Sequence, residues 1–155
     1  AGYTKTLPET IRNPLHHVKI INTGRPAFRI GPNGGEIGEP IPTGAVLYEG
    51  QVSTVTCATT PFYGYKMNMF PFATKRKGRF QLRVVSIKPW EVAYNIYPCW
   101  NGTLRHPKLI DHYVDRVRVI FDQAMPYQLG GEASGYRKEL TFSLNQGNHT
   151  MLQQI

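Results

Sequence analysis

Residues 116–144 read RVRVIFDQAMPYQLGGEASGYRKELTFSL, and this stretch decides the fold. Apolar and polar side chains alternate from Arg116 to Phe121 and again from Lys138 to Leu144, which is the period of a strand with one buried face. Gly130-Gly131 lies between the two runs and is a common turn signal in hairpins. The stretch therefore predicts a β-hairpin with Glu132 just after its turn. It is either an ordinary hairpin with an exposed carboxylate, or a rigid frame whose glycines let a ligand approach closely.

The rest of the sequence carries the same kind of signal. Its 15 Gly and 12 Pro are spread along 155 residues and separate short apolar runs, which favours many strands and turns over long helices. Turns are expected at residues 31–35 and at Glu49-Gly50. We therefore expect a mainly β fold, an antiparallel β-sandwich with one or two short helices. Further strands are expected at residues 18–21, 25–30, 36–42, 45–48, 52–58 and 80–85. The strand at residues 80–85 is expected to be half-buried. Residues 104–112 are expected to form a loop or a short turn of helix.

One helix is expected to begin near Pro89, because proline is tolerated in the first turn. Pro98 would end or kink it. Trp90, Tyr94 and Tyr97 share one helical face by their spacing. Packing in the core is the default interpretation of these aromatic residues, and a lipid-contacting groove beside the sandwich is the alternative.

Size and charge restrict the class of protein. The length suits a single domain, residues 1–155, with a real core. A net charge of +8 and a pI near 9.7 attract polyanions such as nucleic acid, anionic lipid or nucleotide phosphates, and charge alone does not choose among them. No apolar run is long enough to span a bilayer, and no signal peptide opens the sequence. We therefore expect a cytoplasmic protein in which Cys57 and Cys99 are free thiols, with a disulfide between them as the alternative.

A basic cluster, Lys75-Arg76-Lys77, lies in the expected loop before the strand at residues 80–85. The favoured interpretation is a solvated loop with the nearby aromatic residues in the core. The alternative is that Lys75, Arg76 and Lys77 contact lipid or phosphate groups at a membrane surface. The aromatic residues concerned are Phe70, Phe72 and Phe80.

A metal site is not expected. The five histidines show no ligand spacing, and the two His and two Asp between His106 and Asp115 do not form a known metal motif.

Three motifs together resemble a known family. They are PFYGYKMNMFPFA at residues 61–73, GRFQLRVV at residues 78–85, and Gln-x-x-Gly-Glu-x-x-Gly at residues 128–135. In order and spacing they resemble the C-terminal domain of the bacterial diacylglycerol kinase-like lipid kinases, relatives of the sphingosine and ceramide kinases. The resemblance runs from about Leu47 to Leu144. It implies an antiparallel sandwich that forms the substrate-side, lipid-binding half of an ATP-dependent lipid kinase.

The resemblance also implies roles for individual residues. The family's turn is usually Asp-Gly-Glu, and its Glu accepts a proton, so Glu132 is the candidate catalytic residue and Gly131 a candidate nucleotide-binding position. Gly130 stands where the family has Asp, which leaves one carboxylate of two. Many members hold a structural magnesium with an Asp just before the glycine that corresponds to Gly78. Lys77 stands there in this sequence, so no metal is expected at that position.

The sequence lacks the Gly-Gly-Asp-Gly-Thr loop of the family's nucleotide-binding domain. The resemblance therefore implies that ATP and Mg²⁺ are held by an N-terminal domain of the same parent chain, and that this domain alone is inactive. The expected partners are that domain and either a lipid substrate or an anionic membrane surface. The protein would then attach to the membrane peripherally. The alternative function is a non-enzymatic basic β-sandwich that binds anionic lipid. Nucleic acid is disfavoured, because residues 66–70 do not interleave basic and aromatic side chains as such a surface requires.

Overall fold

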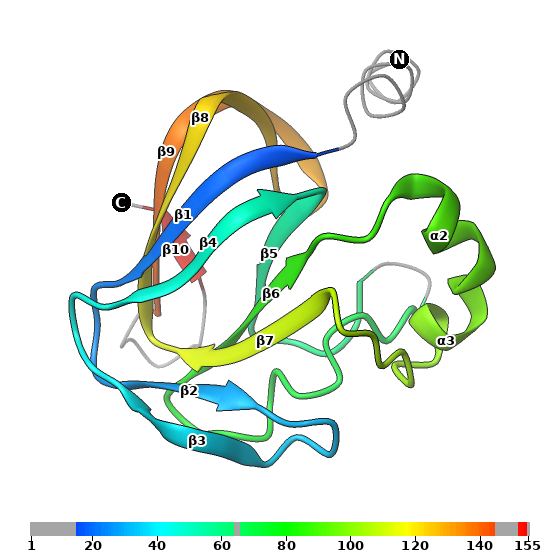
Figure 1. The fold of residues 1–155 in the computed structure, drawn as a ribbon, viewed down its shortest axis with the longest axis horizontal. Helices are drawn as coiled ribbons and strands as arrows, with labels where there is room; N and C mark the ends of the chain where they lie inside the picture. Colours follow the sequence, from blue (N-terminus) through cyan, green and yellow to red (C-terminus); the bar gives the residue numbers. More distant parts are fainter. Residues whose placement is uncertain (1–14, 64–65, 145–151, 155) are drawn as a thin grey trace.

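The computed structural model describes residues 15–63, 66–144 and 152–154, and two antiparallel sheets dominate it (Figure 1). The first sheet has the strand order β10 (Leu152–Gln154), β9 (Glu132–Leu144), β8 (Arg116–Leu129), β1 (His16–Asn22) and β4 (Val46–Val52). The second has the order β3 (Glu36–Ile41), β2 (Ala27–Ile30), β7 (Leu109–Val114), β6 (Phe80–Val85) and β5 (Thr54–Ala58). The expected mainly β, antiparallel sandwich is confirmed.

The core lies between the two sheets and follows from the alternation of apolar residues. Val18 and Ile20 of β1 are fully buried at alternate positions, as are Val117 and Val119 of β8. The facing sheet contributes alternate residues of β6, and all of these side chains pack in one cluster. Each such side chain contributes roughly 1.5–3 kcal/mol when it is fully buried. The fully buried residues of β6 are Phe80, Leu82 and Val84.

The outer face of β6 is also buried, so the expectation of a half-buried strand is wrong. Gln81 and Arg83 alternate with the core residues but are also buried, and they contact the segment at residues 69–72. The Arg83 guanidinium donates to both carboxylate oxygens of Asp111 on β7, at 2.8 and 2.9 Å, and also to the backbone carbonyl of Met69. Gln81 Nε2 donates to Asp111 Oδ1 at 3.0 Å, and Gln81 Oε1 accepts from the backbone N–H of Phe72 at 3.1 Å. This network satisfies the polar groups that burial would otherwise penalise.

Two other boundaries differ from the sequence expectations. The turn expected at Glu49-Gly50 is absent, because β4 continues through both residues and Gly50 pairs with Val18. The chain leaves the first sheet at Ser53 instead, before β5 begins at Thr54. Residues 109–112, expected as a loop or helical turn, belong to β7, the central strand of the second sheet. The sequence from Ala1 to Leu15, rich in Thr and Pro, is expected to be an irregular lead-in, and residues 1–14 of it lie outside the described residues.

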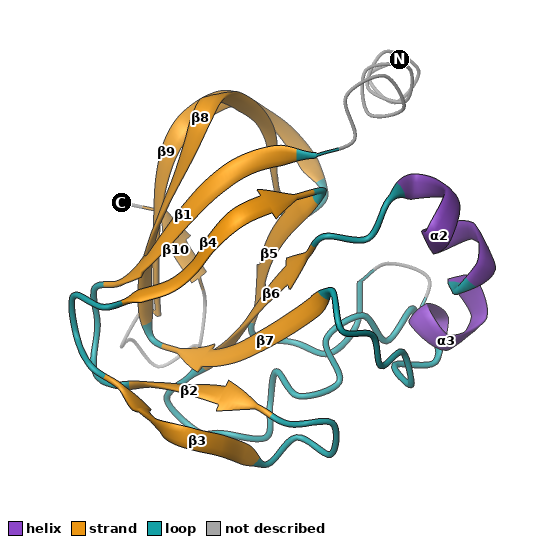
Figure 2. Ribbon diagram, in the orientation of Figure 1, coloured by secondary structure: helices purple, strands orange, loops and turns teal. Residues whose placement is uncertain are grey.

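Two short helices, α2 (Pro89–Tyr94) and α3 (Ile96–Trp100), form where the sequence places a helix that begins near Pro89, and the break between them falls at Asn95 and not at Pro98 (Figure 2). Pro98 lies in the first turn of α3, where a backbone N–H has no partner within the helix and its loss is tolerated. The core-packing interpretation of Trp90, Tyr94 and Tyr97 is wrong, because these side chains are 62%, 85% and 75% exposed. Both helices lie to one side of the sheets rather than across a sheet face.

No helix in the described ranges is long and apolar enough to cross a bilayer. Cys57 on β5 and Cys99 on α3 are free thiols, which confirms that part of the expectation. Burial raises the pKa of both thiols, so neither is activated toward the thiolate.

Candidate functional site

The turn between β8 and β9 takes the form predicted from its two glycines. Leu129 pairs with Glu132, and the intervening Gly130 and Gly131 have φ angles of 58° and 88°. Positive φ at both central residues is the requirement of the type I′ hairpin turn, which glycine meets without steric cost. The turn thus fixes the register of the strands that carry Glu132.

Glu132 is exposed at this tip, and its carboxylate has no partner among the described residues. Its backbone carbonyl accepts a hydrogen bond from Ser134 Oγ at 3.2 Å, so only the main chain of Glu132 is engaged locally. A Cβ added to Gly130 or Gly131 would meet no atom within 4 Å, so the space beside the turn is open. The carboxylate is therefore presented outward and is available to a ligand or a second domain.

Contacts along the hairpin hold this tip in place. Gln128 Oε1 accepts from the hydroxyl of Tyr63 at 3.2 Å, which links the tip to the segment at residues 61–70. Arg118 on β8 donates to Glu139 on β9 at 2.5 Å. Hydrogen bonding to Arg118 lowers the pKa of Glu139. The hairpin is therefore linked to a neighbouring loop, and Glu132 is exposed at its tip, a geometry that both interpretations of residues 116–144 share.

The three basic candidates Lys75, Arg76 and Lys77 lie elsewhere, beside the β2–β3 hairpin. Lys75 Nζ donates to the carbonyl of Asn33 at 3.3 Å, and Arg76 forms an ion pair with Glu36. Lys77 is exposed and has no polar partner in the described part of the chain. The nearby aromatic residues are buried, as the favoured interpretation expected: Phe70, Phe72 and Phe80.

The structure does not bring the sequence-predicted site residues together. Glu132 and Gly131 lie at the tip of a hairpin of the first sheet, whereas Lys75 and Arg76 contact the edge hairpin of the second sheet. Lys77 is thus the member of the basic cluster best placed to meet an external anion.

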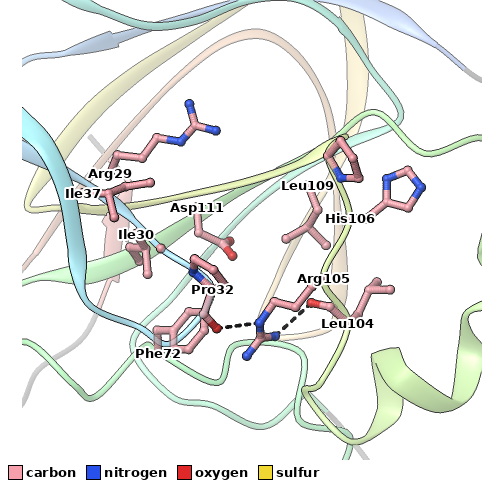
Figure 3. Close-up of a pocket in the computed structure, with 12 residues that line it drawn as sticks. Arg29, Ile30, Pro32, Ile37, Phe72, Leu104, Arg105, His106, Leu109 and Asp111 are labelled. Carbon is pink, nitrogen blue, oxygen red and sulfur yellow. Dashed lines mark hydrogen bonds between the residues drawn. The ribbon is translucent and has the colours of Figure 1, made fainter.

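A cavity of about 350 Å³ lies beside Arg105 and Asp111, two residues that sequence reasoning did not select (Figure 3). Arg105 Nε donates to the carbonyl of Pro32 at 2.6 Å, and its guanidinium lies 5.2 Å from the ring centre of Phe72. Arg29 also lines the cavity, and the Asp111 carboxylate there is already engaged by Arg83 and Gln81. No local pattern could have revealed this cavity, because its walls come from segments that are far apart in the sequence.

A second cavity, of about 150 Å³, is apolar and lies between α3 and the end of the second sheet. Cys99 and Asn95 line it from the helical side, and Met69 and Leu109 line it from the sandwich side. Neither of these two cavities is lined by Glu132. The candidate catalytic carboxylate therefore lies outside both of these cavities.

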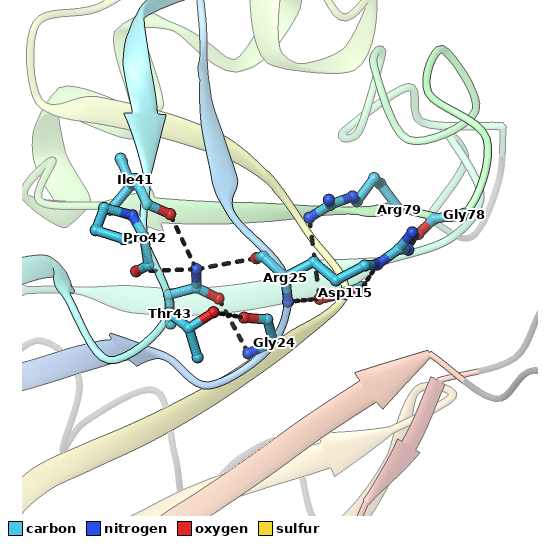
Figure 4. Close-up of polar contacts among 9 residues, drawn as sticks. Gly24, Arg25, Ile41, Pro42, Thr43, Gly78, Arg79 and Asp115 are labelled. Atoms are coloured by element: carbon cyan, nitrogen blue, oxygen red, sulfur yellow. Dashed lines mark hydrogen bonds and ion pairs between the residues drawn. The ribbon is translucent and has the colours of Figure 1, made fainter.

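The segment that carries the basic cluster is anchored at its far end by an ion-pair network (Figure 4). Arg25 Nε lies 2.5 Å from Asp115 Oδ2, and Arg25 Nη2 donates to the carbonyl of Gly78 at 2.9 Å. Arg79 Nη1 lies 3.9 Å from Asp115 Oδ1. Asp115 connects β7 to β8, so the network ties the loop before β6 to a crossover between the two sheets.

The segment from His106 to Asp115 does not assemble a metal site. Asp111 pairs with Arg83, Asp115 pairs with Arg25, and His112 is fully buried on the inner face of β7. Burial lowers the pKa of His112 to about 4, and the charge of Arg29 lowers it as well. Within the described ranges no three His, Cys, Asp or Glu side chains converge in a way that could hold a metal ion.

No protein-family model matches the sequence, and no curated protein matches it. Among solved structures, the chain is similar to the crystal structure of a "putative diacylglycerol kinase" from Bacillus anthracis strain Sterne, with a TM-score of 0.57 and 14% sequence identity. The alignment covers 90% of this chain and 39% of that one, so the chain spans less than half the length of the protein it matches. At this identity the likeness shows a shared fold, one that this chain has in common with part of a diacylglycerol kinase-like protein.

Proposed function

We propose that this chain is the substrate-side, lipid-binding domain of an ATP-dependent lipid kinase of the diacylglycerol kinase type. The observation that carries the proposal is the shared fold, which extends over 90% of the chain. The motifs at residues 61–73, 78–85 and 128–135 support it independently, because they resemble the C-terminal domain of the same class of enzyme.

Glu132 is the residue we propose for the chemistry. Its carboxylate is exposed on a rigid hairpin and is unpaired within the described residues, so it can accept the proton of a lipid hydroxyl as that oxygen attacks a phosphoryl group. Gly131 has no side chain to obstruct a nucleotide at the turn. The site is completed in the cleft with a nucleotide-binding domain, which is a common position for an active site.

The described residues do not fit ATP and Mg²⁺ by themselves. They contain no glycine-rich loop that leads into a helix of useful length, and no group of carboxylates among them converges on a cation. The nucleotide and its metal ion are therefore assigned to the partner domain of the proposed parent chain. This chain's contributions are the base, Glu132, and the contacts to the lipid, with Lys77 and its neighbours Lys75 and Arg76 as candidates for headgroup phosphates.

The test is a Glu132→Gln substitution in the native polypeptide that contains this sequence, assayed with ATP on diacylglycerol- and sphingosine-type lipids. Loss of a positioned general base lowers turnover by about 10²–10⁴-fold, and we expect a loss in this range. Glu139→Gln is the matched control, because Glu139 is an exposed carboxylate on the same hairpin but away from the turn. Equal turnover in the Glu132→Gln protein and its parent would reject the role of Glu132.

The second candidate function is a basic β-sandwich that binds anionic lipid without catalysis. The observation that favours it is Gly130, which stands where the resembled family has a second carboxylate. It predicts no phosphorylation by the native polypeptide, together with retention on anionic vesicles at low salt. Any ATP-dependent phosphorylation that requires Glu132 would exclude it.

A further inference from the structure

Five large apolar side chains are exposed within eleven residues of α2 and α3, which we call the aromatic arm (residues 90–100). Their exposed fractions range from 42% to 85%. Soluble domains rarely expose such a group of apolar residues without a binding role. The five are Trp90, Tyr94, Ile96, Tyr97 and Trp100.

One side of the arm packs against the sandwich, and the aromatic side chains are exposed on the arm's other surfaces. Cys99 and Asn95 line the small apolar cavity together with Met69 and Leu109. The backbone carbonyl of Trp100 accepts from the N–H of Asn68 at 2.9 Å. Figure 1 shows the arm beside the sheets and clear of them, with the segment around residue 68 next to α3. The exposed aromatic residues are therefore on a supported structure and not on an isolated loop.

Charge is distributed very unevenly along the sequence, and the arm lies within its most basic stretch. Residues 59–110 contain nine Lys and Arg and a single acid, Glu91, which gives the whole net charge of +8; the rest of the chain contains nine of each. Two of the nine, Arg79 and Arg83, are buried. Six of the others are exposed: Lys66, Lys75, Lys77, Lys88, Arg105 and Lys108. Of these six, Lys88 and Lys108 contact the arm, through Glu91, whereas Lys75 contacts the β2–β3 hairpin.

The single acid of this stretch, Glu91, lies in the arm and pairs with Lys108, which lies outside it. Both Glu91 carboxylate oxygens lie within hydrogen-bonding distance of Lys108 Nζ, at 3.0 and 3.3 Å, and Glu91 Oε2 accepts from the backbone N–H of Lys88 at 2.8 Å. The arm itself therefore carries no unpaired carboxylate to repel an anionic partner.

We propose that the aromatic arm docks on an anionic lipid bilayer, with Trp90, Tyr94 and Tyr97 in the headgroup region. Trp and Tyr are the side chains enriched at membrane interfaces, where an apolar ring and a polar edge are both accommodated. Exposed lysines beside such a face add attraction to anionic lipid. This inference rests on the proposed function, because membrane docking would bring a lipid kinase to its substrate. It places the membrane contact at the aromatic arm and not at the Lys75-Arg76-Lys77 cluster.

The test is flotation of the chain with vesicles of phosphatidylcholine alone or mixed with phosphatidylserine, at low and at high salt. We expect flotation with the anionic vesicles, weakened by salt. The substitution Trp90→Ser/Tyr94→Ser/Tyr97→Ser should lower partitioning on the order of tenfold or more, because it removes the apolar area that inserts. The matched control is Ile37→Ser/Tyr136→Ser, two exposed apolar side chains outside the arm, which should float like the parent chain.

A second measurement uses the unsubstituted chain, whose two tryptophans, Trp90 and Trp100, both lie in the arm. Vesicles that contain brominated lipid should quench their fluorescence if the arm inserts. Absence of quenching, absence of flotation, or equal flotation of the arm variant and its parent would overturn the proposal. A shift of the parent from dimer to monomer on arm substitution, with flotation unchanged, would assign the surface to a second copy instead.

These outcomes are separable from those for the proposed function. Flotation requires no turnover, and a Glu132→Gln chain should float like its parent. Turnover on a short-chain, water-soluble lipid analogue should be unchanged by arm substitution, because the arm does not contain Glu132. If the chain does not float with vesicles, the kinase proposal is unaffected. If Glu132→Gln does not change turnover, the flotation result can still be interpreted.

Discussion

The tip of the β8–β9 hairpin and the outer face of the β6–β7 pair each carry a carboxylate, and their surroundings are opposite. Asp111 is buried and accepts three hydrogen bonds from Arg83 and Gln81. Glu132 is exposed and unpaired among the described residues. The buried carboxylate of Asp111, whose acceptor positions are filled, maintains the fold, whereas the unpaired carboxylate of Glu132 is the one that we propose for chemistry. The comparison predicts that Asp111 substitutions change stability and Glu132 substitutions change activity.

The largest expected effect on stability is that of Asp111→Ala. It leaves the Arg83 charge buried without its partner, which destabilises a folded protein by about 3–5 kcal/mol. Replacing both members of the pair, as in Arg83→Met/Asp111→Leu, should cost much less, because no buried charge then remains. Urea unfolding of the three proteins measures this difference, and an equal loss in the single and double variants would break the assignment of Asp111 to stability.

The next largest effect concerns His112, the neighbour of Asp111 on β7. Its folded pKa of about 4 lies below the usual value near 6.5, so the unfolded chain binds a proton first as pH falls. The folded state should therefore lose up to about 3 kcal/mol of stability between pH 6.5 and pH 4, and none of this contribution above pH 6.5. The free energy of unfolding, measured at several pH values in this range, should fall with pH in the parent and should fall much less in a His112→Leu variant. The same slope in both proteins would contradict the assignment.

A smaller effect is expected at the hairpin turn. Gly131→Val places a branched side chain at φ 88°, and a left-handed conformation costs an ordinary residue roughly 1–2 kcal/mol. Gly130→Asn should be nearly neutral, because asparagine tolerates positive φ in this turn type and the site is open. Hydrogen exchange of β8 and β9 amides would locate the change. Equal protection in the two variants would show that the turn does not fix the frame of Glu132.

The smallest effect is expected from Glu139→Gln. Glu139 and Arg118 pair on the surface of the hairpin, and such exposed pairs often contribute nothing measurable. Thermal unfolding of this variant should coincide with that of the parent. A clear decrease in Tm would mean that exposed carboxylates of this hairpin are structural, which would weaken the contrast between Glu132 and Asp111.

Local patterns predicted the features that depend on neighbouring residues. Alternation at residues 116–121 and 138–144 and the two glycines at 130 and 131 were sufficient for the hairpin, because a turn and its flanking strands lie within one short segment. Strand β7 was missed for the opposite reason. Asp111 and His112 interrupt its apolar pattern, and their partners and covering groups come from distant segments.

Burial by distant segments explains the remaining differences. The period of two in β6 correctly separates Phe80 and Leu82 from Gln81 and Arg83, but it cannot show that the second face is also buried and contacts residues 69–72. Helical spacing likewise predicts one shared face for Trp90, Tyr94 and Tyr97, but it cannot show that the helix breaks at Asn95 or that no other element packs on these side chains. The cavity beside Arg105 is assembled entirely from such long-range contacts.

The measurement that tests the central claim most directly compares Glu132→Gln with Asp111→Asn in the native polypeptide, recording lipid phosphorylation and thermal unfolding for each. The account predicts that Glu132→Gln lowers turnover by about a hundredfold or more with its Tm unchanged, and that Asp111→Asn lowers the Tm. Full turnover in the Glu132→Gln protein would contradict the claim that this hairpin supplies the base.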